Sequence, residues 1–600
     1  MEEVSVSAES STAPHQSADA SAESGIESLL TRLENVESRR LRDSLAIVLD
    51  NDRETKPAFS SSWVLPTPPP QAQLVRSYPI GDADVRLYRL PDRTESLYFV
   101  APFEYSLDSH QLKVLCKARE ELRSLNPGKV ELRTPQEARM YAVQVGEGLL
   151  AAASRKDEAG IGMDKSEEKA VLRKLASVLA RYTTGLGVLE IPLADPNVQD
   201  IYIDAPNSRC PVHLILGAVD GGLSQRCVTN IRLTEGDAES LLSRFRFESG
   251  RPFSEAMPVL ETNLDEFKSR VTAIGKPLSP HGLAMAVRRH STEPWTLPRL
   301  IAAKSLTPFA AGLLSFLIDG RCTILVAGSR GAGKTSLLGA LMLELPQSQR
   351  ILTIEDTLEL PTTQMQMLGY KVQNLFVQSS LGGLGEMTAD EALRVSLRLG
   401  ESALVLGEVR GQEARTLYEA MRAGTAGSSV LGTIHGNSSK AVYERIVHDM
   451  GIPPMAFAAT DIIVIAGLAR PGGTQRQLRR VTEITELAKS RGPGEFSPLM
   501  SYEPKADELK GVDKILWGSE KISSIAGQWG LSTEETMENI RIRGECKRRI
   551  VAESVRRADP SLLGARFVAA ANAKYWSLVE SGLAGDVMLS EWTNWLAGGW

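Results

Sequence analysis

The sequence has little of what marks several common protein classes. Its five cysteines are scattered and never occur in C-x-x-C spacing, so neither a zinc site nor a disulfide framework is indicated. A basic excess is also missing, because the net charge is −6 and the pI about 5.9, whereas nucleic-acid-binding domains usually carry a basic footprint. We therefore expect a reducing compartment and no nucleic-acid partner.

Long hydrophobic runs are lacking as well. The apolar stretch at 461–469 is far shorter than the roughly 18 residues that a membrane span needs, and the start of the chain is acidic where a signal peptide would be basic. We expect a cytoplasmic protein that reaches a membrane only through partners or a surface.

What the chain does have is enough apolar sequence for several cores. Its 600 residues, 42% of them hydrophobic, predict three to five domains. We expect residues 1–74 to contain a disordered segment, an amphipathic helix at 29–45 and a proline-rich linker. Two α+β domains should follow, a small one at 75–160 and a second at 165–295. A wound α/β nucleotide-binding domain is expected at 306–490 and a mostly helical region at 495–600. The helix at 29–45 could dock on a partner or on its own protein.

The strongest motif is a glycine-rich loop that fits G-x-x-x-x-G-K-[ST]. It consists of Gly328, Ser329, Arg330, Gly331, Ala332, Gly333, Lys334 and Thr335, preceded by a strand-like run and followed from Ser336 by a helical pattern. Glycines let successive amides and the helix N-terminus face an anion. Lys334 would reach the β and γ phosphates of ATP, and Thr335 would hold Mg²⁺ through its hydroxyl. The sequence therefore predicts a Mg²⁺–ATP site.

Polar side chains follow three further apolar runs. Glu355, Asp356 and Glu359 follow the run at 350–354, Glu408 and Arg410 follow the run at 403–406, and His435 follows the run at 429–434. Parallel strands end at one edge of a sheet, so these carboxylates could hold metal-bound waters or accept a proton from the attacking water. An acidic loop is usually just solvated and a single histidine is often structural. Three such strands after one phosphate loop nevertheless favour an active site.

Taken in order, these segments resemble the type II and type IV secretion ATPase family, which includes pilus motors, archaellum motors and conjugation ATPases. TIEDTLE resembles its aspartate box, LVLGEVRG its Walker B strand and AGTAGSSVLGTIHGNSS its histidine box, with further likeness in SGRPFSEAMPVLE and VRRHSTEPWTLPRLI. The likeness covers about 165–490. The wording EPWTLPRLI and the missing four-cysteine module favour the archaeal branch. Glu401 and Ser402 stand where the family commonly has Pro-Asp.

The resemblance implies a RecA-like ATPase domain and assigns roles to matching residues. Glu359 would polarise the attacking water, Glu408 would lie near Mg²⁺ together with Thr335, and His435 would belong to the catalytic set. The matching arginines are Arg251, Arg270, Arg288, Arg289, Arg394, Arg398 and Arg410. Those of the second N-terminal domain would close over nucleotide at a subunit boundary, a task that suits the always-charged guanidinium.

The function implied is a homo-hexameric motor that hydrolyses ATP at the cytoplasmic face of the membrane. It would act on a polytopic membrane platform protein and power pilus-like filament assembly or type II/IV secretion. Two alternatives are a nucleic-acid translocase or helicase and, within the family, an archaellum motor. A non-hydrolysing scaffold subunit would have a damaged phosphate loop. A basic stretch at 541–557 could meet anionic lipid, although a solvated helix face is the simpler interpretation.

Overall fold

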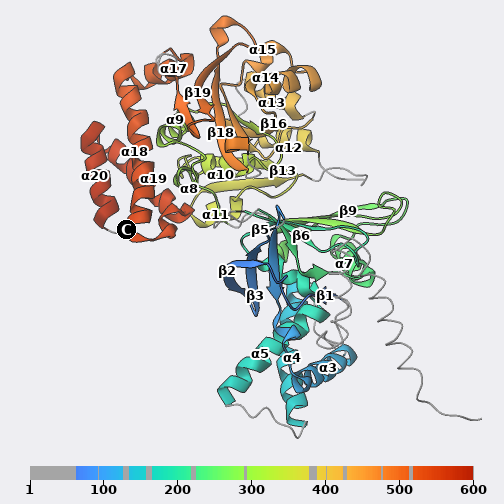
Figure 1. Ribbon diagram of the computed structural model, residues 1–600. Helices are drawn as coiled ribbons and strands as arrows, with labels where there is room; N and C mark the ends of the chain where they lie inside the picture. The colour runs from blue at the N-terminus through green and yellow to red at the C-terminus, as the bar shows by residue number, and fades with distance from the viewer. Residues whose placement is uncertain are drawn as a thin grey trace, which may run out of the picture. The chain divides into compact units, whose positions relative to one another are not determined.

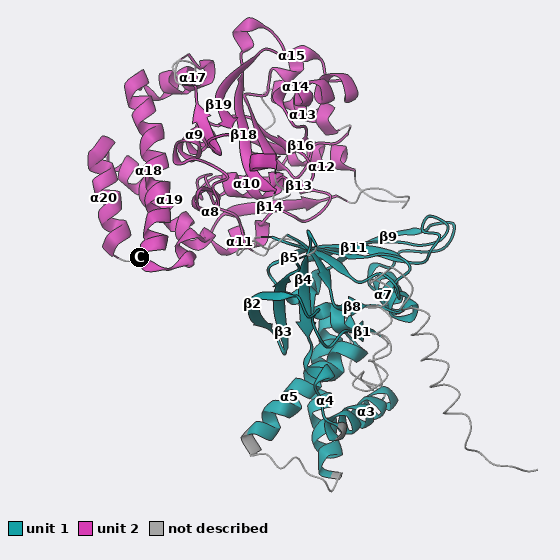
Figure 2. Cartoon of the chain, in the orientation of Figure 1, with its two compact units in different colours: residues 1–289 teal, residues 290–600 magenta. Residues whose placement is uncertain are grey.

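The chain folds as two compact units, residues 1–289 and residues 290–600 (Figure 2). The computed structural model describes residues 62–91, 93–125, 134–156, 165–217, 225–289, 293–377, 388–400, 402–411, 413–422, 429–473, 477–512 and 518–598. The segment at 1–25 and the helix predicted at 29–45 lie outside the described residues. Each unit is built around a nine-stranded sheet.

Unit 1 contains a mainly antiparallel sheet. Its strand order is β2 (Gln73–Ile80), β3 (Ala83–Arg89), β4 (Ser96–Ala101), β7 (Arg226–Thr229), β6 (His213–Leu216), β5 (Val198–Ile203), β11 (Ala284–Arg289), β10 (Ser269–Ile274) and β9 (Val259–Leu264). A separate short pair joins β1 (Trp63–Val64) to β8 (Ile231–Arg232). The parallel pair β4–β7 aligns Ser96 with Cys227, and Tyr98 shares one apolar core with Ile201.

The strands of the two N-terminal domains expected at 75–160 and 165–295 therefore lie in one sheet and pack into one apolar core. The physical reason is the pairing of β4 with β7, which extends the three strands of the first module into a larger sheet shared with the second. Pairing between strands this far apart in sequence cannot be read from local pattern.

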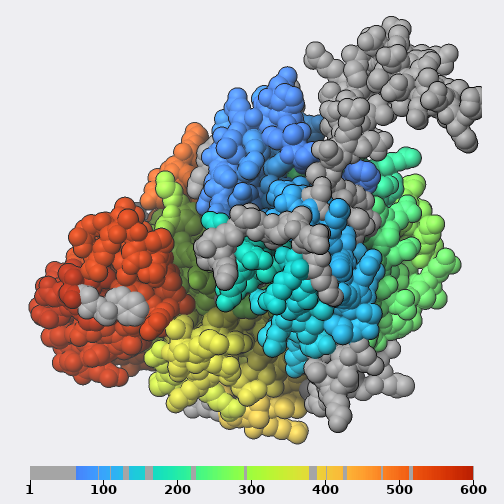
Figure 3. Space-filling model, turned by 90° about the horizontal axis from the view of Figure 1, so that it is seen from below, coloured from blue at the N-terminus to red at the C-terminus, as the bar shows by residue number. Residues whose placement is uncertain are grey.

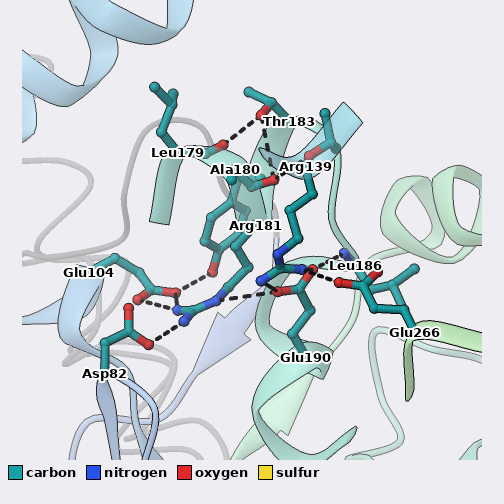
Figure 4. A network of polar contacts seen from close by, with 12 residues as sticks. Asp82, Glu104, Arg139, Leu179, Ala180, Arg181, Thr183, Leu186, Glu190 and Glu266 are labelled. Carbon is teal, nitrogen blue, oxygen red and sulfur yellow. Dashed lines mark hydrogen bonds and ion pairs between the residues drawn. The ribbon is translucent and has the colours of Figure 1, made fainter. Parts of the chain in front are cut away.

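Three helices form a layer of unit 1 with an apolar core of their own: α3 (Ser109–Ser124), α4 (Pro135–Lys156) and α5 (Lys165–Thr183) (Figure 1). An ion-pair network fastens this layer to the strands (Figure 4). Arg181 on α5 pairs with the buried Glu104 and with Asp82 in the β2–β3 turn, while Arg139 on α4 donates two hydrogen bonds of 2.8 Å to Glu190. Buried charges are costly to leave unpaired, so the network holds helices and sheet in one arrangement.

Unit 2 is a wound α/β fold, which confirms the predicted fold class. The strand order is β14 (Lys371–Phe376), β13 (Arg350–Glu355), β15 (Ala403–Leu406), β16 (Ser429–His435), β12 (Ile324–Gly328), β17 (Ile462–Ala469), β18 (Leu478–Leu487), β19 (Phe496–Glu503) and β20 (Glu508–Gly511). Strands β14 to β17 are parallel, and β18 to β20 extend the sheet antiparallel. Val326 and Leu325 on β12 enter different cores, as expected of a central parallel strand buried on both faces.

Helices cover both faces of the unit 2 sheet (Figure 1). One core takes residues from α8 (Leu297–Ala302), α9 (Pro308–Asp319), α10 (Lys334–Met342) and α11 (Thr362–Met367), and the other from α12 (Ala389–Ser396), α13 (Glu413–Arg422), α14 (Ser439–Glu444) and α15 (Pro454–Phe457). Among the helices in the described ranges, none combines the length and apolar character needed to cross a membrane.

The region after residue 494 begins with two strands before it becomes helical. β19 and β20 precede α17 (Glu520–Trp529), α18 (Thr533–Arg557), α19 (Ala565–Glu580) and α20 (Gly585–Gly598). The expectation of a mostly helical region missed these strands, which continue the sheet by antiparallel pairing after a glycine-containing turn. A capping box begins α18, because Ser532 and Glu535 each accept a hydrogen bond from the backbone N–H of the other.

Helix α18 anchors the C-terminal helices to the rest of unit 2. It crosses α9 where Gly312 faces Gly544, and a Cβ on Gly312 would lie only 2.2 Å from the carbonyl oxygen of Ile540. Backbones therefore touch directly at this crossing, and only glycine fits. In the space-filling view the C-terminal helices, in red, form one continuous lobe (Figure 3). They are an integral part of the unit 2 core.

The basic stretch at 541–557 has two kinds of member. Arg543 and Lys547 are buried and pair with Asp319 at 2.6 Å and Glu344 at 2.9 Å. The others pair with carboxylates three or four residues earlier: Arg541 with Glu538, Arg548 and Arg549 with Glu545, and Arg556 and Arg557 with Glu553. Such pairs are usual on a solvated helix face. Contact with anionic lipid stays a prediction.

Candidate active site

The carboxyl ends of neighbouring strands bring the predicted site residues to one edge of the unit 2 sheet. Gly328 at the end of β12 is in register with His435 on β16 and with Ala466 on β17. The next strand, β15, leads to Glu408, and β13 beside it ends at Glu355. The segments that the sequence singled out therefore meet where ligands bind in open α/β sheets.

The loop between β12 and α10 depends on its glycines. Gly331 and Gly333 have φ values of +78° and +94°, which side chains rarely adopt. A Cβ on Gly328 would lie 2.2 Å from the carbonyl oxygen of Ala466. Helix α10 begins at Lys334, directly after this loop. Turned amides followed by a helix N-terminus form an anion-binding site.

Two donors of the loop converge on one oxygen. Lys334 Nζ lies 3.2 Å from the carbonyl oxygen of Ser329, and the Ala332 N–H donates to the same oxygen at 3.3 Å. Ser329 and Arg330 are exposed, and Ser336 in the first turn of α10 is half-buried. A bound phosphate oxygen would have to replace this carbonyl oxygen as the acceptor of both donors.

Thr335 and Glu359 lie side by side. The Thr335 hydroxyl donates to Glu359 Oε2 at 3.0 Å, and Glu359 is half-buried in the turn after β13. Both contribute oxygen, the ligand atom that Mg²⁺ prefers. The residues predicted as metal ligand and as catalytic base are thus in contact.

Glu355 has a different role, although it belongs to the same acidic segment. Its side chain is buried and accepts the backbone N–H groups of Glu359 at 2.9 Å and Leu360 at 2.8 Å. Burial raises the pKa of Glu355 to about 7. The contacts make Glu355 the residue that shapes the turn carrying Glu359.

Glu408 has two charged or titratable partners, His435 and Arg410. His435 Nε2 lies 3.0 Å from Glu408 Oε1, and Arg410 binds Glu408 Oε2 and reaches Asp356 with its other nitrogen. Burial and the nearby charge of Lys334 lower the pKa of His435, against the opposing effect of Glu408. The imidazole is therefore mainly neutral at neutral pH.

The arginines expected to act between domains do not behave alike in unit 2. Arg410 is half-exposed and bridges the two acidic segments of the site. Arg394 on α12 pairs with Asp390 one turn earlier at 3.0 Å, and Arg398 is exposed. Within the described parts of unit 2, neither Arg394 nor Arg398 forms an ion pair or hydrogen bond with the phosphate loop.

Two arginines of unit 1 face each other on the open side of the sheet. Arg270 on β10 is directly opposite Arg288 on β11, while the residues that alternate with them, such as Val271 and Val287, point into the core. Arg270 pairs with Glu261 at 3.0 Å and Arg288 with Asp200 at 3.0 Å. Like charges placed opposite each other in a sheet are unfavourable, so this pair is a concentrated cationic patch partly offset by carboxylates.

Arg251 and Arg289 are held differently. Arg289 shares the face of Val287 and donates to the carbonyl oxygen of Asp195, and burial lowers its pKa. Arg251 donates to the carbonyl oxygen of Glu261 at 3.2 Å and is half-buried. Arg289 therefore lies on the opposite face from the Arg270–Arg288 pair, although it is adjacent to Arg288 in sequence.

One basic residue at the phosphate loop was missed by the sequence reasoning. Arg479 on β18 donates from Nε to the carbonyl oxygen of Gly331 at 2.9 Å. No sequence motif predicts the position of Arg479, because that position follows from the antiparallel pairing of β18 with β17, which aligns Arg479 with Leu468.

Comparison with known proteins gives one family. The model of the family described as "Type II/IV secretion system protein" matches residues 193–494. A putative conjugal transfer protein of Mycobacterium tuberculosis is 28% identical over 329 residues, covering 52% of this chain and 88% of the relative. An uncharacterized protein of Methanocaldococcus jannaschii is 30% identical over 268 residues, covering 42% of this chain and 90% of the relative. Among solved structures, the VirB11 ATPase of the Brucella suis type IV secretion system, in complex with sulphate, matches 50% of this chain and 96% of its own at 23% identity, with a TM-score of 0.25.

Proposed function

The chain belongs to the type II/IV secretion system protein family, and from this membership we propose that it is an ATP-hydrolysing motor of a secretion or pilus-type machine. The observation that carries the proposal is the contact of Thr335 with Glu359 beside the phosphate loop. It joins the residue that would hold Mg²⁺ to the one that would activate water.

The loop residues would bind the phosphates of ATP. Lys334 and the Ala332 amide both donate to the Ser329 carbonyl oxygen, and a phosphate oxygen bound beside the loop would take over these two donors. The oxygen donors of Thr335 and Glu408 suit Mg²⁺, which when bound would neutralise charge on the β and γ phosphates. The loop amides and Lys334 would stabilise the charge that develops as the terminal phosphate leaves.

Glu359 would orient the attacking water and take its proton. It is half-buried and next to Thr335, whereas the Glu355 carboxylate is committed to two backbone amides. His435, mainly neutral, would keep Glu408 in place through the contact at 3.0 Å. A positioned base of this kind is worth about 10² to 10⁴ in rate.

Arg270 and Arg288 would complete the site in a ring. Both are always charged, and their opposed placement favours a shared anion such as a phosphate group. A homo-hexameric ring would let these arginines reach the nucleotide across a domain or subunit boundary. Arg251, Arg394, Arg398 and Arg410 are the remaining candidates for that boundary, and Arg289 is the weakest because its guanidinium is tied to the Asp195 carbonyl oxygen.

The partner that fits this motor is a polytopic membrane platform protein at the inner face of the cell membrane. The net charge of −6 disfavours the nucleic-acid translocase as a second candidate. The proposal is tested by measuring Mg²⁺-dependent ATP turnover of the full chain and by identifying the membrane protein that co-purifies with it. Turnover without a membrane partner but with DNA stimulation would favour the translocase instead.

A further inference from the structure

The peptide between Gly331 and Ala332 forms one hydrogen bond within the loop, from the Ala332 N–H to the Ser329 carbonyl oxygen at 3.3 Å. Gly331 has a φ of +78°, is exposed, and has no atom within 4 Å of the position a Cβ would take. Gly333, two residues on, also has a positive φ. Glycines on both sides make the peptide plane easy to rotate. Its orientation matters, because rotation would turn the Ala332 N–H away from the phosphates.

An external contact fixes this peptide. Arg479 Nε donates to the Gly331 carbonyl oxygen at 2.9 Å. In a trans peptide the C=O and the following N–H point in opposite directions. The Ala332 N–H is accordingly directed inward, to the Ser329 carbonyl oxygen at 3.3 Å, where Lys334 also points. The bond from Arg479 to the carbonyl oxygen therefore supports the same peptide orientation as the weaker bond of the amide to Ser329.

Arg479 is itself firmly placed. Its carbonyl oxygen accepts the Ser305 hydroxyl at 2.8 Å and Arg480 Nη1 at 2.9 Å. Arg480 is buried and forms a two-bond pair with Asp507, at 2.7 and 2.8 Å. Two-bond pairs of this type fix orientation as well as position. Asp507 follows β19, beyond the end of the family match at residue 494, so this part of the chain contributes to the placement of Arg479.

We infer that Arg479 is a positioning residue for phosphate binding, which acts by holding the Gly331–Ala332 peptide with its amide toward the β-phosphate. This rests on the proposed function, since it assumes that the loop binds nucleotide phosphates. Arg479 works through the loop backbone from its outer side and needs no contact with the nucleoside.

Phosphate affinity tests the inference. The full-length Arg479→Ala chain should bind ADP and inorganic pyrophosphate more weakly by the same factor, about tenfold to a hundredfold, which is typical of losing a charged hydrogen bond. Pyrophosphate has no base or ribose, so equal losses locate the effect at the phosphates. Arg479→Lys, which keeps one donor, should recover part of the affinity. Arg470→Gln removes a charge from the exposed end of β17 and should leave both affinities unchanged.

The other outcomes are equally decisive. Unchanged pyrophosphate affinity in Arg479→Ala would overturn the inference, whether or not ADP binding falls. Equal losses in Arg470→Gln would also overturn it, since long-range charge would then suffice. Lys334→Ala separates the two claims: if it abolishes ADP binding while Arg479→Ala has no effect, only the inference fails, and if neither matters, the proposed function fails. Thermal unfolding without ligand should match the parent chain for both arginine variants, and a fall confined to Arg479→Ala would make its role structural.

Discussion

Thr335 donates a hydrogen bond of 3.0 Å to Glu359, a residue 24 positions later in the chain. The two belong to different motifs, the phosphate loop and the acidic turn after β13. Their contact places the Glu359 carboxylate beside the hydroxyl that would hold Mg²⁺.

Replacing Glu359 by Gln should separate binding from chemistry. The amide keeps the shape and can still accept from Thr335, but it cannot take a proton. ATP affinity should therefore persist, while turnover should fall by about 10² to 10⁴. Glu355→Gln is the matched control, because Oε1 can still accept both backbone amides. Normal turnover in Glu359→Gln together with a large loss in Glu355→Gln would reverse the assignment of the base.

Glu355 should also give the fold a pH dependence. Its pKa in the folded chain is raised to about 7 from 4.5, so between these values the folded state binds more protons than the unfolded state. Stability should then fall as pH rises from about 4.5 to 7, by up to about 3 kcal/mol from this group. Glu355→Gln should flatten that fall. Chemical denaturation of both chains at pH 5 and pH 8 measures it, and an identical pH dependence in the two would contradict the assignment.

The opposed arginines of unit 1 should matter for turnover but little for folding. Turnover per site should rise with protein concentration as rings form and then saturate. Arg270→Ala should lower the plateau, by up to the 10³ to 10⁵ that arginine fingers contribute elsewhere. Arg289→Ala should instead lower the melting temperature, because it removes the contact to the Asp195 carbonyl oxygen. Full activity at every concentration from a monomer would defeat the ring hypothesis.

Lys547 should be required for the stability of unit 2. Its removal leaves Glu344 buried without its cation, a loss of about 3 to 5 kcal/mol. Glu344 comes just after the phosphate-loop helix α10, so the variant should also weaken nucleotide binding. Arg556→Ala, on the exposed face of the same helix, should change the free energy of unfolding by no more than about 0.5 kcal/mol. Equal effects of the two substitutions would remove the anchoring role of Lys547.

The sequence predicted the edge of the sheet better than the identity of each residue there. Glycines, Lys334 and the carboxylates were predictable because each follows an apolar run, and parallel strands end together. Glu355 and Glu359 could not be distinguished, since only burial separates them. Arg288 and Arg289, in contrast, could have been distinguished from the sequence. Neighbouring residues of a strand point to opposite faces of the sheet, so strict alternation would have excluded one of the two from a shared phosphate-binding face.

The local sequence pattern could not predict contacts between segments that lie far apart in the chain. The union of β4 with β7, the antiparallel strands after residue 494 and the contact of Arg479 with Gly331 all depend on how strands are ordered in the sheet. The glycine crossing of α9 and α18 is a further example. A fragment covering 306–490 would lack α18 and expose this core, so the ATPase unit to be expressed alone is the whole of unit 2, residues 290–600.

ATP turnover by the full-length chain with and without Lys334 tests the central claim most directly. Lys334 would supply the cation that meets the β and γ phosphates, so Lys334→Ala should abolish the Mg²⁺-dependent hydrolysis expected of the parent chain. Lys440→Ala, an exposed lysine of α14, serves as the control for a lost surface charge and should hydrolyse ATP normally. Unchanged turnover in Lys334→Ala would place the chemistry outside this loop and contradict the account.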